Sequence, residues 1–217
     1  MLPIRFDRSK ELKILCLGAH SDDLEIGCGG TLLKTFAAFE NVQCYWVVFS
    51  ANGKREKEAI DSAKALLQPI SRQSIITKRF QDGYFPFHGG EIKNAFEEIK
   101  GAFSPDLVLT HYRDDRHQDH RLISDLTWNT FRDHLILEYE IPKYDGDLGN
   151  PNLYITISED ICEKKVDHVM RHFPSQESKH WFTKDAFFSI LRLRGIESGS
   201  QEKYAEAFYS RKMVAII

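Results

Sequence analysis

The stretch LGAHSDDLEIGCGG, residues 17–30, joins an apolar run to a glycine-rich segment and places His20, Asp22 and Asp23 at the junction. The run that leads into it, LKILC at 12–16, is typical of a buried strand. Titratable side chains at the end of such a strand are costly to bury unless they have a partner or a task. The stretch therefore predicts a functional site directly after the first strand.

Short apolar runs alternate with amphipathic segments along the first half of the chain. Strands are expected at 12–19, 44–50, 74–80 and 106–112, and helices at 23–39, 54–67 and 91–103. Repeated alternation of strand and helix indicates a parallel sheet with helices on both faces. The predicted fold is α/β, a Rossmann-like three-layer sandwich with a mostly parallel central sheet.

The second half of the chain is less regular. A helix is expected at 121–134, strands at 135–141 and 152–158, and a helix at 159–173. From about residue 184 the pattern predicts two helices that are separated near Gly195. Because no linker-like tract interrupts the chain, we expect one domain over 1–217, in which 130–217 completes the sheet and adds a helical cap.

The composition argues against a nucleic-acid-binding protein and against a membrane-spanning one. The formal net charge of −3 shows no basic excess for nucleic acid. No apolar run reaches the roughly 18 residues of a membrane-spanning helix, and the charged N-terminus does not resemble a signal peptide. The four cysteines are scattered without a C-x-x-C pair, at positions 16, 28, 44 and 162. We expect a cytoplasmic protein with buried free thiols and a small-molecule partner; a homo-oligomer stays open.

A second polar motif, THYRDDRHQDHR at 110–121, follows the fourth expected strand. Ligands of parallel α/β sheets bind at the carboxyl ends of the strands, so both motifs should meet at one edge of the sheet. His20 and Asp23 are three residues apart, as are His117 and His120. Nitrogen and oxygen ligands with one open position are typical of catalytic zinc, with iron, cobalt or nickel as alternatives.

Each motif alone has a simpler interpretation. HSDD could cap a helix through Ser21 or Asp22, and DDRHQDHR could be a solvated charged loop. Their coincidence at the same edge of the sheet favours metal binding. GCGG, residues 27–30, does not match a dinucleotide-binding turn, because those glycines begin at the strand end. We expect these glycines to allow close packing of the first helix.

The motifs AHSDD (19–23), GCGGT (27–31) and RHQDHR (116–121) resemble those of the LmbE-like, or PIG-L, family of zinc-dependent N-deacetylases. Members of that family remove acetyl groups from N-acetylglucosamine units of glycolipid-anchor, mycothiol and bacillithiol precursors, from antibiotic intermediates and from chitobiose. Ser21 and Gln118 stand where the family has proline, and neither position is a ligand. The resemblance implies a hydrolase that removes an acetyl group from an N-acetylated amino sugar or its conjugate.

The resemblance also implies a role for individual residues. The zinc ligands would be His20, Asp23 and His120. Asp22 would be the general base, protonated His117 would hold the oxyanion, and Asp119 would orient a histidine. Sugar hydroxyls would be bound by Arg55 and Asp82.

Two other functions stay open from the sequence: a zinc amidase acting on a non-sugar acyl substrate, and a carbohydrate-binding relative without catalysis. Asp22 and His117 speak against the second, because a protein that only binds has no need of a base. The aromatic segments GYFPFHGG (83–90) and HFPSQESKHWF (172–182) could stack on sugar rings or pack in the core, with packing favoured.

Overall fold

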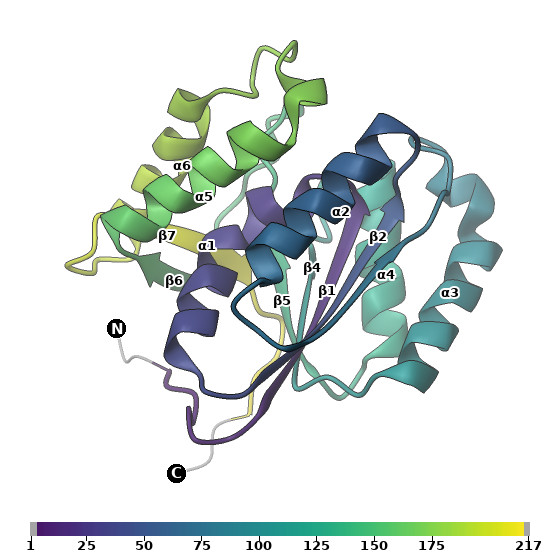
Figure 1. The fold of residues 1–217 in the computed structure, drawn as a ribbon, viewed down its shortest axis with the longest axis horizontal. Coiled ribbons are helices and arrows are strands. Elements are labelled where there is room, and N and C mark those ends of the chain that lie inside the picture. Colours follow the sequence, from purple (N-terminus) through teal and green to yellow (C-terminus); the bar gives the residue numbers. More distant parts are fainter. Residues whose placement is uncertain (1–3, 215–217) are drawn as a thin grey trace.

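The computed structural model describes residues 4–214, which form a seven-stranded sheet in the order β3-β2-β1-β4-β5-β7-β6 (Figure 1). Five strands run parallel: β1 (Leu12–His20), β2 (Val42–Ser50), β3 (Arg72–Thr77), β4 (Leu107–His111) and β5 (Leu135–Tyr139). At one edge, β7 (Tyr204–Tyr209) runs antiparallel to β5 and to β6 (Leu153–Ile157). The mostly parallel sheet is confirmed. The predicted domain also includes residues 1–3 and 215–217, which lie outside the described residues.

Helices cover both faces of this sheet (Figure 1). One face carries α1 (Asp23–Ala38), α2 (Lys54–Leu67), α5 (Glu159–His172) and α6 (Lys184–Glu197), and the other carries α3 (Gly89–Ala102) and α4 (Gln118–Thr130). Short 3₁₀ helices lie at Phe85–His88 and Pro174–Gln176. Along β2, Trp46 and Val48 enter one core while Val47 and Phe49 enter the other, as strand geometry requires. The three-layer α/β prediction is confirmed.

The expectation of buried, free cysteines also holds. The four cysteines are buried and free. Within residues 4–214, no helix combines the length and the apolar character that a bilayer crossing would demand.

The prediction for the C-terminal part is wrong in one respect. The second helix expected after Gly195 is instead the strand β7. Alanine, glutamate and lysine in KYAEAFY favour helix locally. In the fold, however, β7 lies between β5 and β6, where backbone groups on both sides provide hydrogen-bond partners. Pairing with distant strands therefore overrides local propensity.

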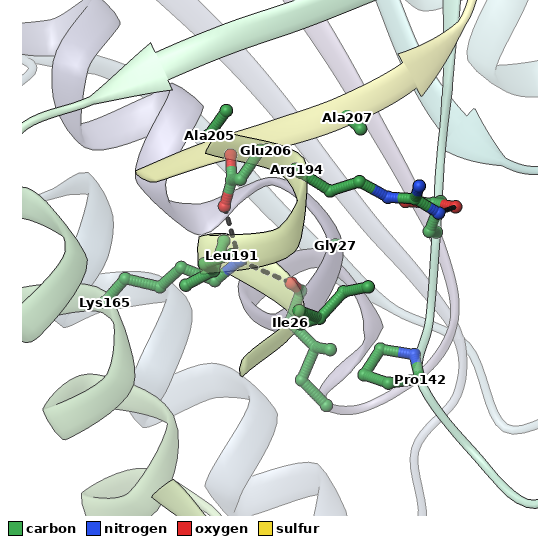
Figure 2. Close-up of a pocket in the computed structure, with 11 residues that line it drawn as sticks. Ile26, Gly27, Pro142, Lys165, Leu191, Arg194, Ala205, Glu206 and Ala207 are labelled. Carbon is green, nitrogen blue, oxygen red and sulfur yellow. Dashed lines mark hydrogen bonds and ion pairs between the residues drawn. The ribbon is translucent and has the colours of Figure 1, made fainter. Parts of the chain in front are cut away.

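A buried ion pair holds β7 against α1 and α5 (Figure 2). The Glu206 carboxylate accepts the backbone N–H groups of Gly30 at 2.8 Å and Thr31 at 2.6 Å. Lys165 Nζ lies 2.5 Å from Glu206 Oε1 and donates to the Ile26 carbonyl at 2.6 Å. Side-chain groups thus satisfy backbone groups within α1, which ties the helix that carries the first motif to the C-terminal strand.

The glycines of GCGG differ in how much space surrounds them. A Cβ on Gly27 would lie 2.2 Å from Cδ2 of Tyr139, whereas a Cβ on Gly29 would meet only Lys165 Cγ at 3.6 Å. Gly27 therefore permits the close approach of α1 to β5, as the sequence led us to expect.

Gly27→Ala is expected to destabilise the protein by about 1–3 kcal/mol, because the added methyl group overpacks against the Tyr139 ring. Gly29→Ala is the matched control in the same helix and is expected to be neutral or up to about 1 kcal/mol more stable, since alanine favours helix. Denaturant unfolding measures both free energies. Equal stabilities of the two variants would contradict the packing role of Gly27.

Candidate metal and catalytic site

The fold brings the two polar motifs together at neighbouring strand ends. β1 ends at His20 and β4 ends at His111, and these strands pair in parallel. His20 Nδ1 lies 3.1 Å from His120 Nε2 and 3.4 Å from Asp23 Oδ2. His120 Nε2 lies 3.6 Å from Asp23 Oδ1, and all three residues are buried. The three residues expected as metal ligands therefore converge, and their role as ligands stays a prediction.

In His20 and in His120, a carboxylate lies beside the ring nitrogen that points away from the other histidine. His20 Nε2 lies 3.1 Å from Asp119 Oδ2, and His120 Nδ1 lies 2.9 Å from Asp115 Oδ2. Burial raises the pKa of Asp119 and of Asp115, but hydrogen bonds from the histidines and nearby N–H groups outweigh it and keep both pKa values below the ordinary value. An ionised carboxylate accepts the ring N–H that faces it, so Nδ1 of His20 and Nε2 of His120 face each other as lone pairs in the neutral rings.

This arrangement attracts positive charge. Burial lowers the pKa of His20, yet the carboxylates of Asp23, Asp119 and Asp82 outweigh it and raise that pKa well above its ordinary value. The same carboxylates would favour a divalent cation between the facing nitrogens, and metal binding would displace the proton. The donor set therefore fits a metal ion.

Other combinations of side chains also lie within reach of one ion. Within the described part of the chain, ligand atoms lie within 4.8 Å of one another in three overlapping groups: His20, His117 and His120; Asp23, His111 and His120; and His20, Asp82, His117 and Asp119. His111 Nε2 accepts the N–H of Ala19 at 2.9 Å, so its lone pair is engaged. This favours His20, Asp23 and His120 over a set that includes His111.

His117 caps α4 through its ring. Its Nδ1 accepts the N–H of Asp119 at 3.3 Å, which leaves Nε2 to carry the proton of a neutral ring. Burial, followed by the charge of His20, lowers the pKa of His117. A neutral Nε2–H donor is compatible with this geometry, and the protonated His117 implied by the resemblance stays a prediction.

Asp22 lies beside the three converging residues and does not act as a side-chain cap of α1. Its Oδ1 accepts from Arg55 Nη2 at 2.7 Å, and its carboxylate has no other hydrogen-bond partner among residues 4–214. Burial, opposed by the charge of Arg55, raises the pKa of Asp22. Arg55 Nη1 also lies 3.8 Å from Asp82 Oδ2, while Asp82 Oδ1 lies 3.1 Å from His20 Nε2. The fold thus brings both expected sugar-binding residues to the same site.

Asp115 has a role that the sequence alone does not predict. It accepts the backbone N–H of His117 at 2.7 Å through Oδ1, while Oδ2 bonds His120. Lys143, from the loop after β5, lies 3.0 Å from the same Oδ2. Asp115 therefore holds both histidines of the second motif, and its position two residues before His117 was the available signal.

Glu25 is a second residue that sequence reasoning missed. It is 1% exposed, its Oε1 accepts from Ser62 Oγ at 2.5 Å, and its Oε2 has no partner among the described residues. Burial raises the pKa of Glu25 from 4.5 to about 8. The folded protein thus keeps a proton on Glu25 that the unfolded chain releases above pH 4.5. The resulting stability is fully present below pH 4.5 and is lost as pH rises through about 8.

Glu25→Gln is expected to make the folded protein more stable at alkaline pH, because glutamine keeps the acceptor for Ser62 without a titrating proton. The gain over the parent protein should be small at pH 5 and should reach on the order of 3 kcal/mol at pH 8. Urea unfolding at both pH values measures it. Glu163→Gln, at an exposed position of α5, is the control. A gain that does not change with pH would contradict the raised pKa.

The comparisons with known proteins identify the family of the chain. The sequence model of the PIG-L family, described as GlcNAc-PI de-N-acetylase, matches residues 15–131, more than half of the chain. The chain belongs to the PIG-L family. This confirms the resemblance found in the sequence and places the protein in a family of deacetylases. The match includes both polar motifs and ends before β5, so Lys143 and Glu206 lie beyond it.

Individual proteins are similar to this PIG-L family member in sequence or in fold. The uncharacterized deacetylase YaiS of Escherichia coli (strain K12) is 26% identical over 173 residues, which cover 76% of this chain and 92% of YaiS. The N,N'-diacetylchitobiose deacetylase from Pyrococcus horikoshii is 20% identical with a TM-score of 0.67, covering 91% of this chain and 83% of that protein.

The fold by itself does not decide the reaction. GalB, the 4-carboxy-2-hydroxymuconate hydratase of Pseudomonas putida KT2440, has a TM-score of 0.68 at 14% identity, covering 95% of this PIG-L family member and 98% of GalB. A deacetylase and a hydratase thus share this architecture. The chemistry must therefore be argued from the side chains of the site.

Proposed function

We propose that this PIG-L family member is a zinc-dependent hydrolase that removes the acetyl group from an N-acetylated amino sugar or its conjugate. The observation that carries the proposal is the convergence of His20, Asp23 and His120, with Asp22 beside them. His20 Nδ1 lies 3.1 Å from His120 Nε2, and the two oxygens of Asp23 lie 3.4 Å from His20 and 3.6 Å from His120. Membership in a deacetylase family supports amide hydrolysis. The substrate would be a small molecule in the cytoplasm.

The proposed metal ligands are His20, Asp23 and His120. Imidazole and carboxylate donors without thiolate suit zinc, and other divalent transition metals are alternatives. When bound, such an ion supplies Lewis acidity that polarises a carbonyl oxygen and lowers the pKa of a water molecule. Asp119 and Asp115 hold the outer nitrogens of the two histidines, which orients the rings toward the ion.

Asp22 is the proposed general base. Arg55 holds Oδ1, and the other oxygen is free to accept the proton of the attacking water. Because burial raises the pKa of Asp22, the carboxylate is a better base than an exposed aspartate. After the C–N bond breaks, the same carboxyl group can return the proton to the leaving amine.

His117 is the proposed hydrogen-bond donor to the oxyanion. With Nδ1 bonded to the Asp119 N–H, its Nε2–H is available to the oxygen of the tetrahedral intermediate. One such donor typically lowers the activation barrier by ~3–4 kcal/mol. Arg55 and Asp82 would bind hydroxyl groups of the sugar, since Asp82 is partly exposed and lies within reach of the site.

An acetate-release assay tests the proposal. The purified protein would be offered N-acetylglucosamine, N,N'-diacetylchitobiose and N-acetylated amino acids, after treatment with a chelator and after addition of zinc. We expect acetate from the sugars only when zinc is present. Release from the amino acids alone would support the zinc amidase instead, and inertness with every divalent metal would contradict the proposal.

A further inference from the structure

The segment between β3 and α3 forms part of the wall of the site. The Asp119 carboxylate accepts the backbone N–H of Gly83 at 2.7 Å and that of Phe85 at 3.1 Å. Asp82, in the same segment, places its Oδ1 3.1 Å from His20 Nε2. The backbone of this segment is therefore fixed by a residue of the second motif.

Gln118 adds a further bond to this segment. Its side-chain amide donates to the Gly83 carbonyl. Gln118 stands where the family motif has proline, which could not make this bond. In this chain the departure from the motif thus helps to hold the segment beside the site.

The aromatic side chains of the segment divide into two groups. Phe85 is fully buried, with its ring centroid 6.0 Å from His20 and 6.2 Å from Phe80. Tyr84 is 49% exposed and Phe87 is 78% exposed, and their ring centroids lie 6.0 Å apart. The expectation that this segment packs in the core therefore holds for Phe85 and fails for Tyr84 and Phe87, which we call the aromatic pair.

The second aromatic segment of the sequence behaves differently. In 172–182, Phe173 and Phe182 are buried and Trp181 is partly buried against the same core. Of these two segments, only 83–90 leaves Tyr84 and Phe87 among the exposed large hydrophobic side chains. Leaving a large apolar side chain in water forgoes roughly 1.5–3 kcal/mol of burial. Leu193 and Ile196 are also exposed, but the aromatic pair differs from them in lying on a segment whose backbone is bonded to Asp119.

The aromatic pair lies on the same short segment as Asp82. Asp82, which lies 3.8 Å from Arg55, is two residues before Tyr84. Ligand sites combine apolar and aromatic walls with a few polar groups that fix orientation. A sugar whose hydroxyls reach Arg55 and Asp82 would direct its attached substituent along this segment.

We propose that the aromatic pair binds a ring-shaped, apolar-faced substituent attached to the N-acetylated sugar, and so sets the preference for conjugates over the free sugar. This inference rests on the proposed function for the identity of the sugar. The occupant is part of a small-molecule substrate, because the segment that carries the pair also carries Asp82 and is bonded to Asp119 of the site.

Binding of two matched glycosides tests the proposal. The probes are p-nitrophenyl and methyl N-acetyl-β-glucosaminide, and calorimetry measures their affinity for the zinc-loaded Asp22→Asn protein. We expect the aryl glycoside to bind about tenfold more tightly. Adding Tyr84→Ser and Phe87→Ser should bring the ratio of affinities close to one and leave the methyl glycoside little changed.

The control removes exposed apolar groups elsewhere. Leu193 and Ile196 on α6 are 47% and 61% exposed, and Leu193→Ser with Ile196→Ser should leave the ratio unchanged. Equal affinities for the two glycosides, or no detectable binding of the aryl glycoside, would overturn the proposal. So would a ratio that survives loss of the aromatic pair.

The readout separates this inference from the proposed function. Binding that depends on the aromatic pair, without acetate release by the parent protein, would support the aromatic surface and count against deacetylation. Sedimentation of the Tyr84→Ser, Phe87→Ser variant adds one further outcome. A shift from oligomer to monomer with an unchanged ratio would assign the pair to a contact between subunits and overturn the proposal.

Discussion

Asp22→Asn is expected to bind zinc as the parent protein does and to lower kcat by about 10²–10⁴-fold, the usual contribution of a general base. Asparagine keeps the acceptor that bonds Arg55 but cannot take a proton from water. Because Asp22 is not one of the three converging residues, its charge is not required to hold the ion. Acetate release and atomic absorption, measured on the same preparation, check the two halves of this expectation.

The control for Asp22→Asn is Asp133→Asn, whose side chain is 91% exposed. It should leave both zinc content and turnover unchanged. Full activity of Asp22→Asn would remove Asp22 from the role of base. Loss of zinc from that variant would instead place Asp22 among the ligands.

Asp23→Ala is expected to lose the metal itself and, with it, all measurable turnover. Asp23 Oδ2 lies 3.4 Å from His20 Nδ1, and Asp23 Oδ1 lies 3.6 Å from His120 Nε2, so this carboxylate approaches both histidines. Loss of an outer hydrogen-bond partner typically weakens metal binding 10–100-fold, so loss of a ligand should exceed about 100-fold. Zinc content after dialysis against a weak chelator measures the effect.

Asp23→Asn separates the charge of Asp23 from its structural role. Asp23 Oδ2 also accepts the backbone N–H of His20 at 2.6 Å, and asparagine can keep this bond. We expect Asp23→Asn to fold more stably than Asp23→Ala and still to lose zinc. Unchanged zinc content in both variants would show that the ligands are drawn from another group, such as His20, His117 and His120.

Metal binding and the reaction that the site catalyses are separate properties. Because a hydratase shares this fold, detection of zinc alone would not establish deacetylation. The features that favour amide hydrolysis are the family assignment and the position of Asp22 beside the converging residues. The acetate assay and the Asp22→Asn variant therefore test amide hydrolysis directly.

Much of the fold could be predicted from local pattern. The helix expected at 54–67 has these bounds in the structure, and β1 and α1 differ from their expected ends by one residue. Apolar residues recur at regular intervals in these elements, and neighbouring residues alone are enough to recognise such a pattern. The third strand ends at Thr77 rather than at 80, because the regular parallel pairing with β2 stops there. Lys78 and Phe80 still donate backbone hydrogen bonds to the end of β2, and an isolated bridge joins Arg79 to Ser50.

The place of the site was also predictable, for a topological reason. Parallel strands end at the same edge of a sheet, so motifs after β1 and β4 had to meet there. This is why the two motifs could be grouped from sequence although about 90 residues separate them, whereas the choice of His20, Asp23 and His120 as ligands came from the resemblance to the family. Their convergence did not depend on any side-chain detail.

By itself the sequence determined the α/β architecture, the edge that carries the polar motifs and the resemblance to the PIG-L family, because these follow from periodicity, strand direction and short motifs. Only the tertiary structure decided that KYAEAFY is a strand, that Lys143 reaches Asp115, and that Tyr84 and Phe87 face outward while Phe85 packs inward. Each of these depends on partners far away in the chain. Local propensity contains no information about such partners, so the competition between local preference and distant hydrogen bonds or packing is settled only when the chain folds.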